Sequence, residues 1–130
     1  MYKNKNNEFN AFCWHYDEAE ILPNNTVVLA SNDKSQFQSI SFKVDNSEIW
    51  AVQYHPEFNP DWMAGLMAQR KDILLENNIY ESSSDLEKEK NIFQNYKEID
   101  DNLLYEYTDV IDDTKHSLEI SNWLKFNKNY

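Results

Sequence analysis

A histidine and a glutamate stand two residues apart in this chain, as His55 and Glu57, with Pro56 between them. Proline fixes its own φ angle and biases the preceding residue toward an extended conformation, so the imidazole leaves the chain in a set direction. The carboxylate can then turn back toward one ring nitrogen. In nucleophilic catalysis a histidine takes the proton of the nucleophile while a carboxylate fixes its tautomer. The pair therefore suits a general base and its orienting group, and a surface ion pair at a turn is the simpler alternative.

The elements that would position this pair are a strand before it and a helix after it. Residues 49–54 predict a buried strand, and α/β proteins place their ligand crevices beyond the carboxyl ends of strands. Asn59 fits a helix N-cap and Pro60 fits the first helical position. We expect this helix to run to about Glu76, to pack on the sheet and to hold the turn. Its apolar stripe consists of Met63, Leu66, Met67, Ile73 and Leu74.

A second pair of reactive side chains comes earlier. Residues 9–14 predict a short strand that ends at His15, which is the second candidate for a functional residue. The alternative is a histidine at a strand end that is capped by Asp17. Cys13 lies on the same strand face as His15, so the two form either a Cys-His dyad or, more simply, a buried structural thiol and its neighbour. A metal site from Cys13, His15 and His55 lacks the ligand spacing typical of zinc.

The segment between these two sites predicts a hairpin. Residues 26–30 are β-branched and follow a turn, which favours a strand. Residues 36–44 alternate, with Ile40, Phe42 and Val44 on one face and polar residues on the other, which predicts a strand exposed to water on one side. Residues 45–48 form a short link to the strand that precedes His55. Such a link favours an antiparallel hairpin.

The last third of the chain predicts helices. Residues 84–87 fit a capping box, and the segment that they open predicts either one amphipathic helix to about Ile111 or two helices with a break near Asp100 and Asp101. Residues 112–114 restart the chain into a last helix, and we interpret the acidic residues of this region as a solvated face. The apolar stripe of the first part consists of Ile92, Phe93, Tyr96, Ile99, Leu103, Leu104, Tyr107, Val110 and Ile111. That of the last helix consists of Leu118, Ile120, Trp123, Leu124 and Phe126.

Four motifs together resemble one family. The run Trp50-Ala51-Val52-Gln53-Tyr54-His55-Pro56-Glu57-Phe58 closely resembles the last catalytic motif of class I glutamine amidotransferases. Trp14-His15-Tyr16-Asp17-Glu18, Leu22-Pro23 and Leu29-Ala30-Ser31 precede it in that family's order. The likeness is greatest to the branch related to the glutaminase domain of GMP synthase, and it covers residues 9–80, with a weaker continuation to the C-terminus.

The resemblance implies an α/β fold, here the C-terminal part of a flavodoxin-like class I glutamine amidotransferase fold: a mixed sheet with flanking helices and a helical C-terminal tail. It implies glutamine hydrolysis by a Cys-His-Glu triad and delivery of ammonia to a second reaction. By position His55 is the base, Glu57 orients it, and His15 lies beside the site as a substrate-binding candidate. We expect no cofactor and no metal.

The family's nucleophilic cysteine has no counterpart here. It sits on a tight elbow flanked by glycines, whereas the single glycine of this chain, Gly65, follows the motif, and the single cysteine, Cys13, lies in a predicted strand. We therefore expect residues 1–80 to be the C-terminal half of an amidotransferase-like domain and residues 81–130 a helical extension. Such a partial chain is expected to be inactive alone. The alternative is a non-catalytic binding or interaction protein derived from that fold.

Charge and composition limit the partners. The 130 residues carry a net charge of −11, from 12 Lys and Arg against 23 Asp and Glu, which disfavours nucleic acid and anionic membranes. One cysteine allows no internal disulfide, and residues 1–8 lack the apolar core of a signal peptide, so we expect a cytoplasmic protein. The expected partners are glutamine and either a synthase subunit or the missing N-terminal half, with an oligomer possible because a sheet edge is left open.

Overall fold

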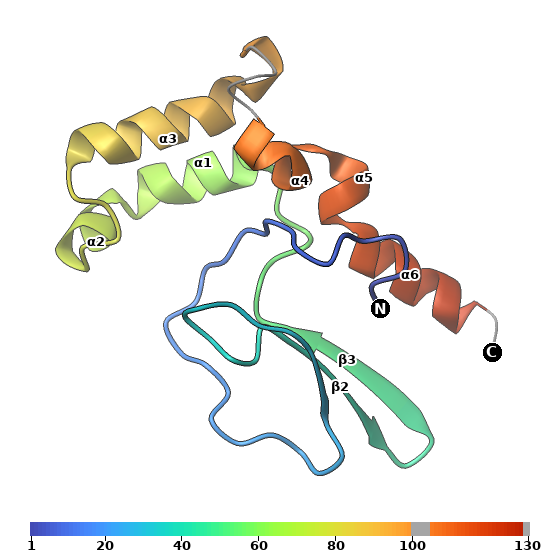
Figure 1. Ribbon diagram of the computed structural model, residues 1–130. Helices are drawn as coiled ribbons and strands as arrows, with labels where there is room; N and C mark the ends of the chain where they lie inside the picture. The colour runs from blue at the N-terminus through green and yellow to red at the C-terminus, as the bar shows by residue number, and fades with distance from the viewer. Residues whose placement is uncertain (100–104, 129–130) are drawn as a thin grey trace.

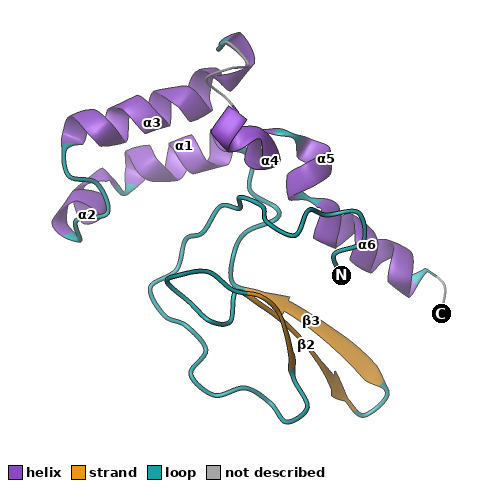
Figure 2. Ribbon diagram, viewed as in Figure 1, coloured by secondary structure: helices purple, strands orange, loops and turns teal. Residues whose placement is uncertain are grey.

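The sheet is small and antiparallel. The computed structural model describes residues 1–99 and 105–128, and its strands are β1 (Val27–Ala30), β2 (Ser39–Val44) and β3 (Ser47–Val52). They form one sheet in the order β1-β2-β3, with both pairs antiparallel. Helices flank this sheet and a helical tail follows, so the predicted α/β class is confirmed (Figures 1 and 2). The parallel strands of a mixed sheet are not among the strands of the described residues.

The predicted hairpin is confirmed, with a tighter turn than expected. Val44 pairs with Ser47, so only Asp45 and Asn46 lie between β2 and β3. Asp45 has a φ of 52°, in the left-handed region that Asp and Asn tolerate better than other non-glycine residues. Two-residue loops of this kind match the twist of the flanking strands. The turn therefore sets the register of the strand that leads to His55.

The strand predicted for residues 9–14 does not form. It is reduced to a single antiparallel bridge between Cys13 and Tyr54. The backbone N–H of Asn10 instead donates to the Asp109 carboxylate at 3.1 Å, and the Phe12 side chain is buried among the helices. The prediction is wrong here because partners distant in the sequence take the hydrogen bonds and the apolar side chain that a strand would have used.

The prediction that one face of residues 36–44 is buried and the other is exposed to water is also wrong. Ser39 is 1% exposed, whereas Val44 is 52% exposed. Among the described residues the apolar core is made by helices and by Phe12 of the N-terminal segment, with no residue of the sheet. Period-two alternation therefore does not decide which β2 residues are buried. An aromatic contact does join the sheet to the tail, since the Trp50 and Phe126 rings lie 5.1 Å apart.

The helix after the site begins as predicted and breaks once. In α1 (Pro60–Gln69) the Asn59 side chain accepts the N–H of Trp62 at 2.9 Å, and Pro60 is the first helical residue. Arg70, with φ −109° and ψ 18°, separates α1 from α2 (Lys71–Glu76). The expected packing of α1 on the sheet is wrong. Its main partner is α3 (Ser83–Asn95), because Met63, Ala64 and Met67 meet the apolar face of that helix.

The core thus lies between helices. Its buried residues are Phe12, Met63, Ala64, Met67, Leu74, Leu86, Phe93 and Val110. The helix α3 begins two residues earlier than predicted, because the Ser82 hydroxyl accepts the N–H of Asp85 at 3.2 Å and forms the cap. It ends at Asn95, before the 3-10 turn η1 (Tyr96–Glu98), so the long helix predicted to continue from it is shorter than expected.

The tail consists of short helices. They are η2 (Tyr105–Tyr107), α4 (Thr108–Ile111), α5 (Asp113–His116) and α6 (Leu118–Asn127). The predicted restart is confirmed, since the Asp112 carboxylate accepts the N–H of Thr114 at 2.8 Å. The break predicted at Asp100 and Asp101, with Leu103 and Leu104 of the stripe, lies outside the described residues. No helix in residues 1–99 or 105–128 has the length and apolarity needed to cross a membrane.

The N-terminal segment runs beside α6 (Figure 1). The side-chain amide of Asn122 donates to the backbone carbonyls of Met1 and Lys3, at 2.8 and 2.9 Å. The tail therefore contacts both the first residues of the chain, through Asn122, and β3, through the Phe126 and Trp50 rings.

Candidate active site

The His55 and Glu57 side chains meet at the end of the segment that continues β3. The Nδ1–H of His55 donates to Oε1 of Glu57 at 2.8 Å. Since Nδ1 carries the proton in this arrangement, Nε2 of the neutral ring is the nitrogen that can accept a proton. The His55 side chain is 28% exposed and that of Glu57 is 55% exposed, so a reacting group can reach the ring.

The backbone of His55 is fixed on both sides. Its N–H donates to the carbonyl of Phe12 at 2.7 Å, and its carbonyl accepts the N–H of Phe58 at 3.3 Å. The imidazole also stacks on the Phe58 ring, with centroids 4.0 Å apart and an interplanar angle of 11°. Phe58 in turn stacks on Trp62 at 5.8 Å. These contacts restrain the ring plane of His55 in addition to the hydrogen bond from its Nδ1.

Sequence reasoning missed His116 as a neighbour of this turn. Its Nδ1–H donates to the carbonyl of Pro56 at 2.9 Å, and its Nε2 lies 3.1 Å from Oδ1 of Asp113. The residue is only 9% exposed. His116 comes 60 positions after Pro56, so no local spacing pointed to this contact.

Glu119 is a second residue that the sequence does not reveal, because the acidic residues of the tail predict a solvated face. It is 3% exposed and its Oε1 accepts both the Tyr54 hydroxyl and the Lys5 ammonium, each at 2.6 Å. Burial, and then the hydrogen bond to Glu119, raise the pKa of Tyr54 well above its usual value. The available signal was the position of Glu119 between Leu118 and Ile120, in an apolar stretch of helix.

Cys13 and His15 have separate partners. The Cys13 thiol faces the side-chain oxygen of Gln38 at 3.8 Å, and desolvation raises the pKa of the thiol. The Nδ1–H of His15, an exposed residue, donates to the carbonyl of Asp17 at 3.0 Å. Asp17 does cap His15, through its backbone. The two side chains thus do not form the hydrogen-bonded dyad considered from the sequence, and a raised thiol pKa disfavours the thiolate that a nucleophile needs. The alternative of a buried thiol is also wrong, because Cys13 is exposed.

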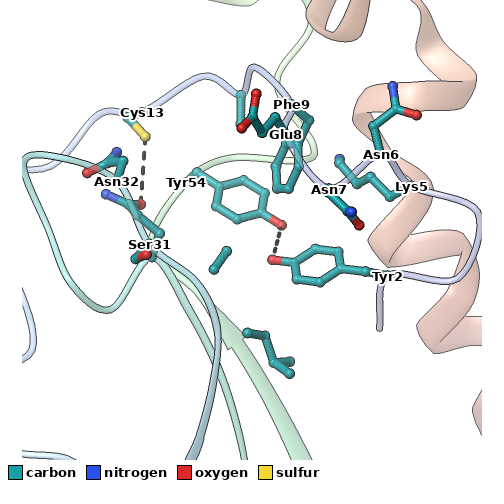
Figure 3. Close-up of a pocket in the computed structure, with 14 residues that line it drawn as sticks. Tyr2, Lys5, Asn6, Asn7, Glu8, Phe9, Cys13, Ser31, Asn32 and Tyr54 are labelled. Atoms are coloured by element: carbon teal, nitrogen blue, oxygen red, sulfur yellow. Dashed lines mark hydrogen bonds between the residues drawn. The ribbon is translucent and has the colours of Figure 1, made fainter.

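A cavity of about 500 Å³ lies next to the segment that carries His55 (Figure 3). Its lining comes from Tyr54, Cys13, the N-terminal segment, and the end of β1 with the residues after it. His55 and Glu57 are not among the lining residues. In the described part of the chain no group of three or more His, Cys, Asp and Glu side chains is placed to hold a metal ion. The geometry therefore supports acid–base chemistry at His55 and gives no support to a metal site from Cys13, His15 and His55.

Comparison with known proteins agrees with the resemblance noted in the sequence. The family model for glutamine amidotransferase class-I matches residues 1–73. A gamma-glutamyl-L-1-hydroxyisopropylamide hydrolase from a Pseudomonas species is 31% identical over 129 residues, which cover 95% of this chain and 43% of the relative. The glutamine-hydrolysing GMP synthase subunit of Methanocaldococcus jannaschii is 37% identical over 57 residues, which cover 44% of this chain and 29% of that protein.

These alignments span less than half the length of either curated relative. No solved structure matches the chain significantly. The family match, however, covers more than half of the 130 residues and includes the strand end with His55 and Glu57. On this evidence the chain belongs to the class I glutamine amidotransferases.

Proposed function

We propose that His55 and Glu57 are the base and the orienting carboxylate of a triad that hydrolyses the amide of a γ-glutamyl group. The observation that carries the proposal is the 2.8 Å hydrogen bond from Nδ1 of His55 to Glu57, which leaves Nε2 to act on a nucleophile. In this reaction a cysteine thiolate attacks the γ-carbonyl and the C–N bond breaks. The imidazolium of His55 gives its proton to the leaving amine, and water then hydrolyses the thioester.

The nucleophile of this triad comes, in our proposal, from outside residues 1–130. Cys13 is the single cysteine of the sequence; it is exposed, but its raised pKa disfavours the thiolate that a nucleophile needs. Residues 1–80 then act as the C-terminal half of the catalytic domain and residues 81–130 as its helical extension. The 130 residues alone are expected not to hydrolyse glutamine, because a triad without its nucleophile keeps little of its rate.

The two relatives suggest two amide substrates. The GMP synthase subunit is named for glutamine hydrolysis, and the Pseudomonas protein for hydrolysis of an N-substituted γ-glutamyl amide. Both substrates share the γ-glutamyl carbonyl and differ in the leaving amine. The alignment with the GMP synthase subunit covers 44% of this chain, whereas that with the Pseudomonas protein covers 95%, including the tail. Because of this wider coverage, we name the substituted amide as a second candidate substrate beside glutamine.

The test compares the protein isolated from its own cell with two variants, His55→Ala and Glu57→Gln. Ammonia release from glutamine and amine release from a γ-glutamyl alkylamide are measured in parallel. Glu57→Gln should lower kcat by about 10⁴-fold, and His55→Ala, which removes the base itself, by about 10⁶-fold. His15→Asn serves as the test of the substrate-binding role proposed for His15, with an expected rise in KM and little change in kcat.

Three results would contradict this proposal. An unchanged rate in His55→Ala would remove the base from its role. Glutamine hydrolysis by the pure 130-residue chain, lost on His55→Ala, would show that no outside nucleophile is needed. A native protein that hydrolyses neither amide would instead favour a binding protein that keeps the fold.

A further inference from the structure

The tail reaches the histidine turn through a backbone carbonyl. The carbonyl of Pro56, which accepts the Nδ1–H of His116 at 2.9 Å, belongs to the planar peptide that joins Pro56 to Glu57. Holding this carbonyl therefore fixes the direction in which the chain enters Glu57. Pro56 and His116 are both buried, so water does not compete for the contact.

A second connection reaches the residue on the other side of His55. The Tyr54 hydroxyl donates to Glu119 at 2.6 Å, and the Tyr2 hydroxyl lies 2.7 Å from the Tyr54 oxygen. A phenol has one proton, so Tyr2 donates to Tyr54 and Tyr54 donates to Glu119. The Lys5 ammonium, with a side chain 6% exposed, neutralises the carboxylate. Tyr54, the residue directly before His55, is thus hydrogen-bonded to α6 inside the protein.

These contacts flank the proposed base: one holds Tyr54, the other holds Pro56, and both come from residues 116–119. We propose that His116 and Glu119 are positioning residues, which act through Pro56 and Tyr54 to keep Nδ1 of His55 aligned with the Glu57 carboxylate. This inference rests on the function proposed above for His55 and Glu57. It assigns a role in the reaction to the helical tail, which acts here through the two neighbours of His55 and not through its ring.

The hydrogen bond donated by His116 distinguishes a positioning role from simple packing. An apolar side chain in place of His116 would fill the same space, but it would leave the buried Pro56 carbonyl without a donor. The peptide would then turn toward water, and Glu57, which is 55% exposed, has no burial of its own to hold it beside His55. A misplacement of about 1 Å in a catalytic group lowers the rate by about 100-fold.

The experiment uses the native protein with ¹⁵N-labelled histidine. The ring ¹⁵N chemical shifts of His55 are measured at alkaline pH, where the imidazole is neutral, and they report whether Nδ1 or Nε2 carries the proton. The variants are His116→Leu, which removes the donor, and His116→Asn, which keeps an amide donor near the position of Nδ1. Tyr54→Phe removes only the hydroxyl that meets Glu119. Ser82→Ala, which removes the side-chain cap of α3, is the control for general destabilisation.

We expect the Nδ1–H tautomer of His55 to dominate in the wild type, in His116→Asn and in Ser82→Ala. It should give way to a mixture in His116→Leu and Tyr54→Phe, with kcat lowered about 10- to 100-fold and KM nearly unchanged. A wild-type tautomer and kcat in both of these variants would overturn the proposal. A loss in His116→Asn equal to that in His116→Leu would also overturn it, because the donor would then be irrelevant.

The ring ¹⁵N shifts and the rate of hydrolysis are separate measurements, so a failure of this inference can be distinguished from a failure of the proposed function. If His55→Ala leaves hydrolysis unchanged, the proposed function fails, and the ring ¹⁵N shifts still decide whether the tail orients His55. If His116→Leu does not fold, Tyr54→Phe decides instead, since it keeps the aromatic ring and its packing.

Discussion

Replacing Glu119 by glutamine should destabilise the protein strongly, because it leaves a buried ammonium group without its counter-ion. In the wild type the Lys5 side chain is 6% exposed, and its Nζ lies 2.6 Å from Oε1 of Glu119. Breaking a buried pair by removal of one partner costs about 3–5 kcal/mol. Lys5 keeps two weaker contacts, the Lys115 carbonyl at 3.4 Å and the Phe9 ring at 4.2 Å, so we expect Glu119→Gln to lower the free energy of unfolding by about 3 kcal/mol.

The assay is urea unfolding followed by tryptophan fluorescence. With a slope of about 1–3 kcal/mol per molar urea, the midpoint should fall by about 1 M or more. The double variant Lys5→Met with Glu119→Gln removes both charges, keeps an acceptor for Tyr54, and should recover most of the loss. The matched control is Lys71→Met, which breaks the Lys71–Glu87 pair, whose side chains are 36% and 37% exposed. We expect the control to leave the midpoint almost unchanged.

The reasoning fails if the double variant is no more stable than Glu119→Gln. In that case the loss would come from the missing carboxylate itself and not from an unpaired Lys5. An unchanged midpoint in Glu119→Gln would refute the burial of the pair. The second carboxylate oxygen of Glu119, Oε2, is buried and has no hydrogen-bond partner among the described residues. Its desolvation already destabilises the folded state, so the change in midpoint tests whether the pair with Lys5 outweighs this cost.

Three further predictions concern stability. Gly65→Ala should stabilise the protein by about 0.5–1 kcal/mol in thermal unfolding, because Gly65 is inside α1 and a Cβ there would meet open space. Phe93→Ala should cost about 3–5 kcal/mol in urea, since this ring lies in edge contact with Phe12 and Tyr107; a loss below about 1 kcal/mol would contradict the helical core. The hydrogen bond from Thr114 lowers the pKa of Asp112 below its usual 3.8, so its contribution is present above that pH and lost as the pH falls through the lowered pKa. Stability measured from neutral pH to about pH 3 should therefore fall less in Asp112→Asn than in the wild type.

Features set by neighbouring residues could be predicted from the sequence. The hydrogen bond between His55 and Glu57 depends on a two-residue spacing and on one proline, both visible in the chain. The Asn59 cap and the hairpin between β2 and β3 are equally local, since the cap joins residues three apart and the turn needs two residues. In each case the groups that interact are close before the chain folds, so few alternatives compete.

Features decided by distant partners could not be predicted. Residues 9–14 have the composition of a strand, but Asp109 takes the backbone N–H of Asn10 from 99 positions away. Likewise α1 has an apolar face that fits a sheet or a helix equally well, and only the folded arrangement selects α3. Glu119 was misjudged because a carboxylate among acidic residues looks solvated until its partners Tyr54 and Lys5 are known.

The fastening of the His55 turn by residues 116–119 has a consequence for biosynthesis. A chain leaves the ribosome from its N-terminus, so the hairpin, the turn and α1 emerge well before the residues that support them. The contacts from His116 to Pro56 and from Glu119 to Tyr54 close loops of 60 and 65 residues, and such long-range closures slow folding. During synthesis the turn is therefore complete in sequence but not yet held in place. A nascent chain arrested before residue 116 would carry both His55 and Glu57 without these supports from the tail.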